Sequence, residues 1–189
     1  MFLASTPAAN ELLETEPLAL LIGMLLDQQI PMEKAFTSPA VLAERLGGGL
    51  DARAIAEYEP GALEELFRRP PALHRFPAAM AKRVQELGRI IVERFDGDAA
   101  SVWTGARDGQ ELLARVASLP GFGEQKAKIF TALLGKQYGV RPKGWREAAG
   151  EFGAEGTQRS VADVVDAVSL KAVREYKQGL KAAAKAAKA

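Results

Sequence analysis

A short glycine-containing segment has the residue types and the spacing of a phosphate-binding site. Gly121 and Gly123 permit positive φ and the close approach of a second backbone. A helix that begins near Glu124 leaves its first amide groups without internal partners, and such amides bind phosphate well. Lys126 and Lys128 add positive charge in the first turns of that helix. The segment therefore predicts contacts to the phosphates of a DNA backbone, which hold a duplex without reading its sequence.

Asp27 is the first candidate for acid–base chemistry. It is the only acidic residue between Leu18 and Met32, and it follows a run of apolar residues. An ionised carboxyl in such surroundings is costly unless it is paired or functional. Asp27 could position a water molecule or hydrogen-bond the edge of a base. The alternative is a carboxylate at the end of a helix that is bonded to a neighbouring backbone amide or to an arginine.

Several kinds of site are excluded by residue types that the chain lacks. There is no cysteine, which rules out disulfides, thiolate zinc sites, cysteine nucleophiles and cysteine-ligated iron–sulfur clusters. The single histidine, His74, has no companion ligands, so we expect no metal site. No basic residue precedes Glu11, and the apolar run Leu18–Leu26 is far shorter than the ~20 residues that span a bilayer. We therefore expect a cytoplasmic protein.

The formal net charge of +1 hides an uneven distribution. Residues 126–189 carry 13 Lys/Arg and 6 Asp/Glu, whereas residues 1–125 carry 12 and 18, which gives local charges of +7 and −6. Such asymmetry is typical of a protein with a polyanionic partner, although a lysine-rich solubilising tail gives the same numbers. The segment 171–189 alternates alanine with lysine and could lie along a DNA backbone, but we expect it to fray beyond Leu180.

The spacing of apolar residues predicts an all-α fold. The best amphipathic helix is 77–95, where apolar residues recur at three- and four-residue intervals. Residues 18–30 are apolar nearly all round, as in a buried central helix. Ser38-Pro39 should open a short helix. Further helices are expected over 52–57, from Pro60 to the Pro70-Pro71 pair, and over 109–118, 124–138, 161–168 and 171–189, with a short turn at 100–104 and a loop containing a short helix at 139–156.

Two motifs together resemble those of a known family. The segment Leu119-Pro120-Gly121-Phe122-Gly123-Glu124-Gln125-Lys126-Ala127 is similar to the helix-hairpin-helix motif. Upstream, the buried helix ends in Leu25-Leu26-Asp27-Gln28-Gln29-Ile30, which is similar to a Gln-containing motif near the damaged base in that family. With the helical spacing between them, the motifs cover residues 17–138 and resemble the helix-hairpin-helix (HhH-GPD) DNA glycosylase superfamily, in its branch without an iron–sulfur cluster. The alternative is another helical protein that carries such a hairpin.

The resemblance implies two all-α lobes with a DNA-binding cleft between them. Residues 17–138 would form a helical barrel lobe with the hairpin, and residues 1–16 with 139–189 would form the second lobe. Gln28 and Gln29 have amides that suit base edges or the gap left by a flipped base, although glutamines at a helix end are ordinarily surface residues. The hairpin carbonyls could hold a structural monovalent cation. The implied contacts to DNA phosphate come from Gly121, Phe122, Gly123, Gln125, Lys126 and Lys128.

The implied activity is that of a monofunctional DNA glycosylase of base-excision repair. It would act as a monomer on double-stranded DNA of the bacterial nucleoid that contains a damaged base or an abasic site. It would flip the damaged base and hydrolyse its N-glycosidic bond. Alkylated purines are the first choice of substrate, because their leaving group already carries positive charge, and deaminated bases are the second. The alternative is a protein that binds DNA lesions or DNA structures without releasing a base.

Two positions depart from the pattern of the superfamily. Bifunctional members carry a Schiff-base lysine two residues after the second glycine of the hairpin, where this chain has Gln125. Lys126 lies one residue further on and is rotated by about 100° around the helix. We therefore expect no β-lyase activity.

The second departure is the absence of the superfamily's catalytic aspartate from the loop after the hairpin. In the matching window, residues 141–147, the only carboxylate is Glu147. Glu147 could replace that aspartate, or it could be solvated in the first turn of a helix, where the helix dipole favours an acid. Asp27 remains the first candidate for the catalytic carboxylate and Glu147 is the second. Trp145, in the same window, could stack on a base or pack the loop onto the helices.

Overall fold

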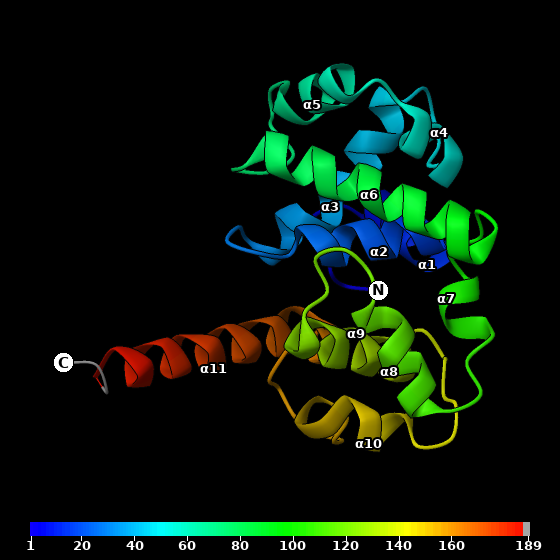
Figure 1. Ribbon diagram of the computed structural model, residues 1–189. Helices are drawn as coiled ribbons and strands as arrows, with labels where there is room; N and C mark the ends of the chain where they lie inside the picture. Colours follow the sequence, from blue (N-terminus) through cyan, green and yellow to red (C-terminus); the bar gives the residue numbers. More distant parts are fainter. Residues whose placement is uncertain (187–189) are drawn as a thin grey trace.

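The structure, a computed structural model, describes residues 1–186, and every regular element in that range is a helix (Figure 1). The prediction of an all-α fold is therefore confirmed. Two 3-10 helices, η1 and η2, span Gly150–Phe152 and Val161–Asp163. The α-helices α1 to α11 span, in order, Pro7–Thr15, Pro17–Leu26, Met32–Arg45, Ala52–Glu57, Pro60–Arg68, Pro77–Phe95, Ser101–Thr104, Gly109–Ala117, Glu124–Gln137, Trp145–Ala149 and Ala167–Ala186.

The bounds of α6 follow directly from the sequence pattern. It begins at Pro77, whose missing amide costs nothing in a first turn, and it ends at Phe95, as predicted. Asp96 then adopts the left-handed conformation at φ 54°. α6 packs against α4 and α5. A Cβ atom at Gly88 would lie 2.8 Å from the carbonyl oxygen of Ala52, so the glycine allows α4 to cross α6 in backbone contact.

α2 is buried along its whole apolar stretch, from Leu18 to Leu26. A helix that is apolar all round has no face for solvent, so it takes a central position. The helix ends at Leu26, earlier than the expected boundary at Ile30. Asp27 adopts φ −70° and ψ 71°, and Gln29 adopts φ 56°, so the chain leaves the helical path there.

The predicted start of the next helix at Ser38-Pro39 is wrong. α3 begins at Met32 and continues through Pro39. Ala35, Phe36 and Pro39 lie on one buried face of α3, and the burial of this face offsets the hydrogen bond that a proline inside a helix removes. The Ser38 hydroxyl lies 2.9 Å from the carbonyl oxygen of Leu73, which ties α3 to the segment before α6.

The helices pack in sequence-local groups. α1 packs against α2 and α3, whereas the hairpin helices α8 and α9 pack against α10, and α9 also packs against η2. Short connections keep consecutive helices adjacent. The expected division into lobes, in which residues 1–16 joined 139–189 and the hairpin joined 17–138, stays a prediction. The buried apolar residues of both groups nevertheless form one continuous core.

The end of the chain differs from the prediction in two ways. Within the expected helix 161–168, only Val161–Asp163 forms a separate helical element, the 3-10 turn η2, and Asp163 accepts hydrogen bonds from the amides of Arg159 and Ser160. α11 extends away from the rest of the molecule (Figure 1) and stays helical to Ala186, past Leu180 where we expected fraying. The part of that prediction that concerns residues 187–189 lies outside the described residues. Neither α11 nor any other helix in residues 1–186 is long and apolar enough to cross a membrane.

Candidate functional site

The hairpin between α8 and α9 packs against the end of α2. Phe122 is buried, and its ring meets the Phe130 ring edge-on at a centroid distance of 5.6 Å. Gly121 adopts φ 79°, which favours glycine. A Cβ atom there would lie 3.4 Å from Cγ of Leu25, so the hairpin backbone passes directly over the last turn of α2. The two motifs found in the sequence are therefore in contact.

The start of α9 offers free amide groups, as the glycine spacing predicts. Gly123 occupies the N-cap position, and no side chain caps the helix. Within the described chain, the amides of Glu124 and Gln125 meet no acceptor, which leaves them available to an anion. Lys128 lies beside them, but its ammonium is 2.6 Å from a carboxylate oxygen of Glu124. An approaching phosphate would share Lys128 with this exposed carboxylate.

Lys126 turns inward, although the sequence suggested a contact to phosphate. Its Nζ atom donates to the carbonyl oxygens of Met24 and Leu25, at 2.8 and 3.1 Å. These carbonyls belong to the last turn of α2, where the helix dipole favours a cation. Burial lowers the pKa of Lys126 from 10.5 to about 8. The ammonium thus joins α9 to α2 instead of facing the outer surface of the hairpin.

Asp27 follows α2 directly and lies close to this ammonium. Burial raises the pKa of its carboxyl above 3.8, against the nearby positive charges of Lys177 and Lys126, which lower it. The negative charge of Glu33 also raises the pKa of Asp27, by less than burial does. Among the described residues, none donates a hydrogen bond to this carboxyl or forms an ion pair with it. The expected alternative, a carboxylate bonded to a backbone amide or to an arginine, is therefore not what the structure shows.

A pocket of about 670 Å³ opens beside Asp27. One wall is the segment from Asp27 to Glu33, which includes the start of α3, and the other is a face of α11 that includes Val173 and Lys177. The pocket has the size of small-molecule sites in proteins, which run from about 300 to 1,000 Å³. Asp27 thus has the setting of a functional carboxylate: it is half-buried, it lacks a protein partner among the described residues, and it opens onto a cavity.

The loop after α2 is fixed by groups that sequence reasoning missed. Nδ1 of His74 accepts from the amide of Phe76 at 3.1 Å, so its Nε2 carries the proton and donates to the carbonyl oxygen of Gln28 at 2.9 Å. Burial lowers the pKa of His74, so the ring stays neutral. Arg83 donates to Oε1 of Gln28 at 3.1 Å. A lone histidine between Leu73 and Arg75 gave no sign of this role.

The two glutamines of the motif have different surroundings. The amide nitrogen of Gln28 donates to the carbonyl oxygen of Leu25 at 2.8 Å, so its side chain is engaged within the protein. Gln29 is exposed, and its φ of 56° is unusual for a residue with a side chain. Both residues line the pocket beside Asp27. Gln29 is the one whose amide is open to a ligand.

Comparison with protein families settles which family carries this arrangement. The model described as "HhH-GPD superfamily base excision DNA repair protein" matches residues 22–188, which include the end of α2, the hairpin and all of α11. The chain belongs to the HhH-GPD superfamily. This membership makes it a base-excision DNA repair protein of the glycosylase type, with DNA as its partner. No curated protein and no solved structure matches the chain.

In this HhH-GPD protein, the loop after the hairpin has a structural role. Trp145 is buried in contact with α9, where a Cβ atom on Gly135 would overlap Cε3 of the indole. The guanidinium of Arg146 lies 4.5 Å from the Trp145 ring centroid and donates to the carbonyl oxygen of Gly153. Of the two alternatives for Trp145, stacking on a base or packing of the loop, the structure shows packing: the indole packs α10 onto α9.

Glu147, the second candidate carboxylate, lies on the exposed side of α10, in its first turn. This position matches the solvated residue that the helix dipole favours. Neither Glu147 nor Trp145 lines the pocket beside Asp27. Among residues 1–186, no group of three or more histidine, aspartate or glutamate side chains is arranged as metal ligands. A monovalent cation at the hairpin, held by backbone carbonyl oxygens, stays a prediction.

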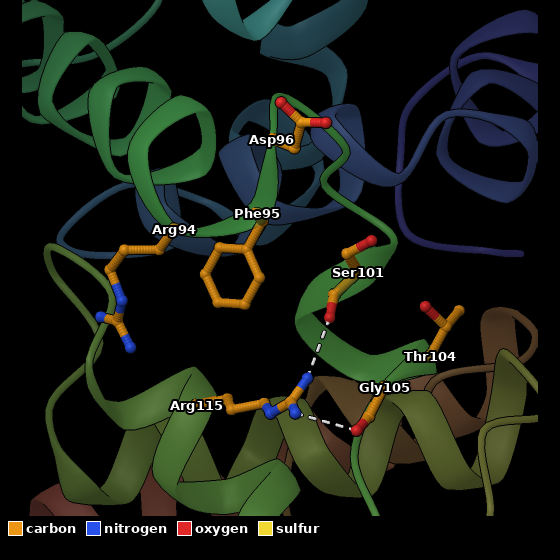
Figure 2. A pocket seen from close by; sticks show the side chains of 7 residues that line it. All are labelled: Arg94, Phe95, Asp96, Ser101, Thr104, Gly105 and Arg115. Atoms are coloured by element: carbon orange, nitrogen blue, oxygen red, sulfur yellow. Dashed lines mark hydrogen bonds between the residues drawn. The ribbon is translucent and has the colours of Figure 1, made fainter.

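A second pocket, of about 610 Å³, lies where α6 is linked through α7 to α8 (Figure 2). Arg94 and Arg115 are its basic lining residues. The guanidinium of Arg115 donates to the carbonyl oxygens of Ser101 and Gly105 and to the carboxylate of Glu111. Arg94 donates to the Ser118 hydroxyl at 2.9 Å. Both arginines already have hydrogen-bond partners within the protein, which hold α6, α7 and α8 together. This second pocket shares no lining residue with the pocket beside Asp27.

Proposed function

We propose that this protein is a monofunctional DNA glycosylase whose catalytic carboxylate is Asp27. The observation that carries the proposal is the setting of that side chain. A carboxyl without a partner among the described residues borders a pocket of about 670 Å³, immediately beside the hairpin whose free amides suit DNA phosphate. The location that we expect for the protein, at the nucleoid, would bring it to chromosomal DNA as its substrate.

The reaction would be hydrolysis of the N-glycosidic bond of a flipped nucleotide. The C1′–N bond breaks with its electron pair leaving on the base, and a water oxygen forms the new bond to C1′. Ionised Asp27 stabilises the positive charge that develops on the sugar and accepts the proton that the water loses. The raised pKa supports this role, because a carboxylate with a higher pKa is a stronger base.

Base lesions with labile glycosidic bonds are the substrates that fit best. An alkylated purine carries positive charge before the bond breaks, so departure of the neutral base needs less assistance. Asp27 would then suffice without the aspartate that the superfamily places after the hairpin. Deaminated bases such as hypoxanthine or uracil are the second choice, since they are poorer leaving groups.

A non-catalytic lesion-binding protein is the second candidate. Arg146 favours it, because the window of the superfamily's catalytic aspartate here contains this arginine, which holds Gly153 and pairs with Glu155. The presence of Asp27 beside the pocket favours the enzyme. The two candidates make opposite predictions for base release.

A lesion panel tests the proposal. Duplex oligonucleotides, each with a single alkylated purine, hypoxanthine, uracil or mismatch, are incubated with the protein, and half of each sample is then heated in alkali. We expect cleavage at an alkylated purine only after alkali, because a glycosylase without lyase activity leaves an intact abasic strand. Tight binding without base release on any duplex would select the non-catalytic candidate.

The absence of β-lyase activity is a separate prediction. Lyases attack C1′ of the abasic sugar with an amine, release water and form an imine that borohydride reduces to a covalent complex. Gln125 is exposed at the required spacing, whereas the Lys126 ammonium is bonded to α2. We expect no covalent complex of the unmodified protein with abasic DNA after borohydride. The variant Gln125→Lys is the positive control and is expected to form one; trapping of the unmodified protein would contradict the prediction.

A further inference from the structure

α11 forms one wall of the pocket and then continues far beyond it. The face that lines the pocket runs from Leu170 to Lys181, at helical spacing. Only Ser169 and Val173 of this helix are buried. Arg174 pairs with Glu33 across the pocket and fixes the helix to the start of α3. The outer half of α11 therefore projects into solvent without a packing partner in residues 1–186 (Figure 1).

Positive charge follows this face outward from the pocket. Lys177, Lys181 and Lys185 recur at four-residue intervals, which places them in one row along the helix. Within the described residues they form no ion pair, in contrast to Lys171, which pairs with Glu175. Lys177 faces the pocket, while Lys181 and Lys185 are exposed. The row thus begins at the pocket that Asp27 borders and ends in open solvent.

We propose that Lys181 and Lys185 bind the DNA phosphate backbone next to the pocket, so that α11 is a second DNA-contacting wall opposite the segment 27–33. Their Cα atoms are about 6 Å apart along the helix, since each residue rises about 1.5 Å. Two ammonium groups at that spacing suit successive phosphates of one strand. The inference rests on the proposed function, because the bound strand is the one that carries the flipped nucleotide.

The proposed contacts are recognised by the salt dependence of binding. Each phosphate contact adds about −0.9 to the slope of log K, where K is the association constant for DNA, against the logarithm of the salt concentration. At ~0.1 M salt, one such contact raises the affinity roughly eightfold. We expect the variant Lys181→Ala/Lys185→Ala to show a slope reduced by about 1.8 on undamaged duplex DNA, measured by fluorescence anisotropy, by the same relation.

A matched variant separates specific contacts from net charge. Gly179 and Ala183 are exposed on the opposite side of α11, so Lys181→Ala/Lys185→Ala/Gly179→Lys/Ala183→Lys keeps the charge but moves it around the helix. We expect this variant to bind as weakly as the double alanine variant. Binding and slope equal to those of the unmodified protein, in either variant, would overturn the proposal.

The test does not depend on base release. Undamaged DNA reports on the phosphate contacts alone, whereas the lesion panel reports on catalysis. A smaller salt dependence of binding in the α11 variants, together with no base release by the unmodified protein, would support DNA binding by α11 and contradict the glycosylase proposal. An unchanged salt dependence in the α11 variants, together with base release by the unmodified protein, would support the glycosylase proposal and contradict DNA binding by α11. Circular dichroism of each variant verifies that α11 is still helical.

Discussion

Asp27→Asn is expected to lower the rate of base excision by about 10²–10⁴-fold, the usual contribution of a positioned acid or base. The substitution keeps the shape of the side chain but removes the charge that stabilises the sugar and the oxygen that accepts the proton from water. Affinity for lesion-containing DNA should stay nearly unchanged, because the proposed phosphate contacts lie elsewhere. Single-turnover excision and fluorescence anisotropy, on the same duplex, measure the two effects.

The same substitution should make the protein more stable at neutral pH. Burial raises the pKa of Asp27 in the folded protein above its ordinary value of 3.8, so the folded state binds this proton more tightly than the unfolded chain. Ionisation therefore costs folding free energy at every pH above the folded pKa, and a neutral amide at this position removes that cost. Loss of excision together with a higher Tm distinguishes a functional carboxylate from a structural one, whose removal would lower Tm.

Glu147→Gln is the matched control, because it makes the same chemical change on the exposed side of α10. Neither the activation free energy of excision nor the unfolding free energy should change by more than about 0.5 kcal/mol, as is usual for surface substitutions. A large loss of excision in Glu147→Gln, with full activity in Asp27→Asn, would transfer the catalytic assignment to Glu147.

The pH dependence of excision gives a further test of Asp27. The rate should fall as the pH is lowered through a midpoint above 3.8, since only the ionised carboxylate acts. Lys177 lowers the pKa of Asp27 more than the other nearby charges, so Lys177→Gln should move this midpoint to higher pH. Lys126 and Glu33 remain in place in this variant. A midpoint that does not move would show that another group controls the acid limb.

Trp145→Ala is expected to reduce the unfolding free energy by about 3–5 kcal/mol, as removal of a buried aromatic side chain usually does. The indole is buried between α9 and α10, so its removal leaves a cavity there. Urea denaturation measures the effect. If Trp145 instead stacked on a base, stability would be unchanged and lesion binding would weaken by about 1–3 kcal/mol.

Gly135→Ala tests the same contact from the other helix. The new methyl group would overlap Cε3 of Trp145, so the indole would have to move. The substitution should therefore destabilise the protein even though alanine favours helix more than glycine does. The control is Gly179→Ala, because a Cβ atom at Gly179 on α11 meets open space. Gly139→Ala is unsuitable as a control, because Gly139 has a positive φ, which alanine rarely adopts.

Local signals in the sequence predicted the helices, but not the environment of the candidate site. The apolar spacing of 77–95 and the proline at its start give α6 directly. The outcome at Pro39 could not be read locally, because the buried face of α3 outweighs the cost of the proline. The direction of Lys126 depends on carbonyl groups about 100 residues earlier, and the charge balance at Asp27 depends on α11. Contacts between distant segments decide both.

The two hydrogen bonds from Lys126 to the last turn of α2 join the hairpin to the helix end that is followed by Asp27. A displacement of the hairpin would carry Asp27 with it, so in the proposed function the distance from a bound phosphate to the Asp27 carboxyl is set within a single unit. The facing wall of the pocket, on α11, shares none of these bonds. If the proposed function is correct, substitutions in that wall should alter which base is accepted, while the distance between the bound phosphate and the Asp27 carboxyl stays constant.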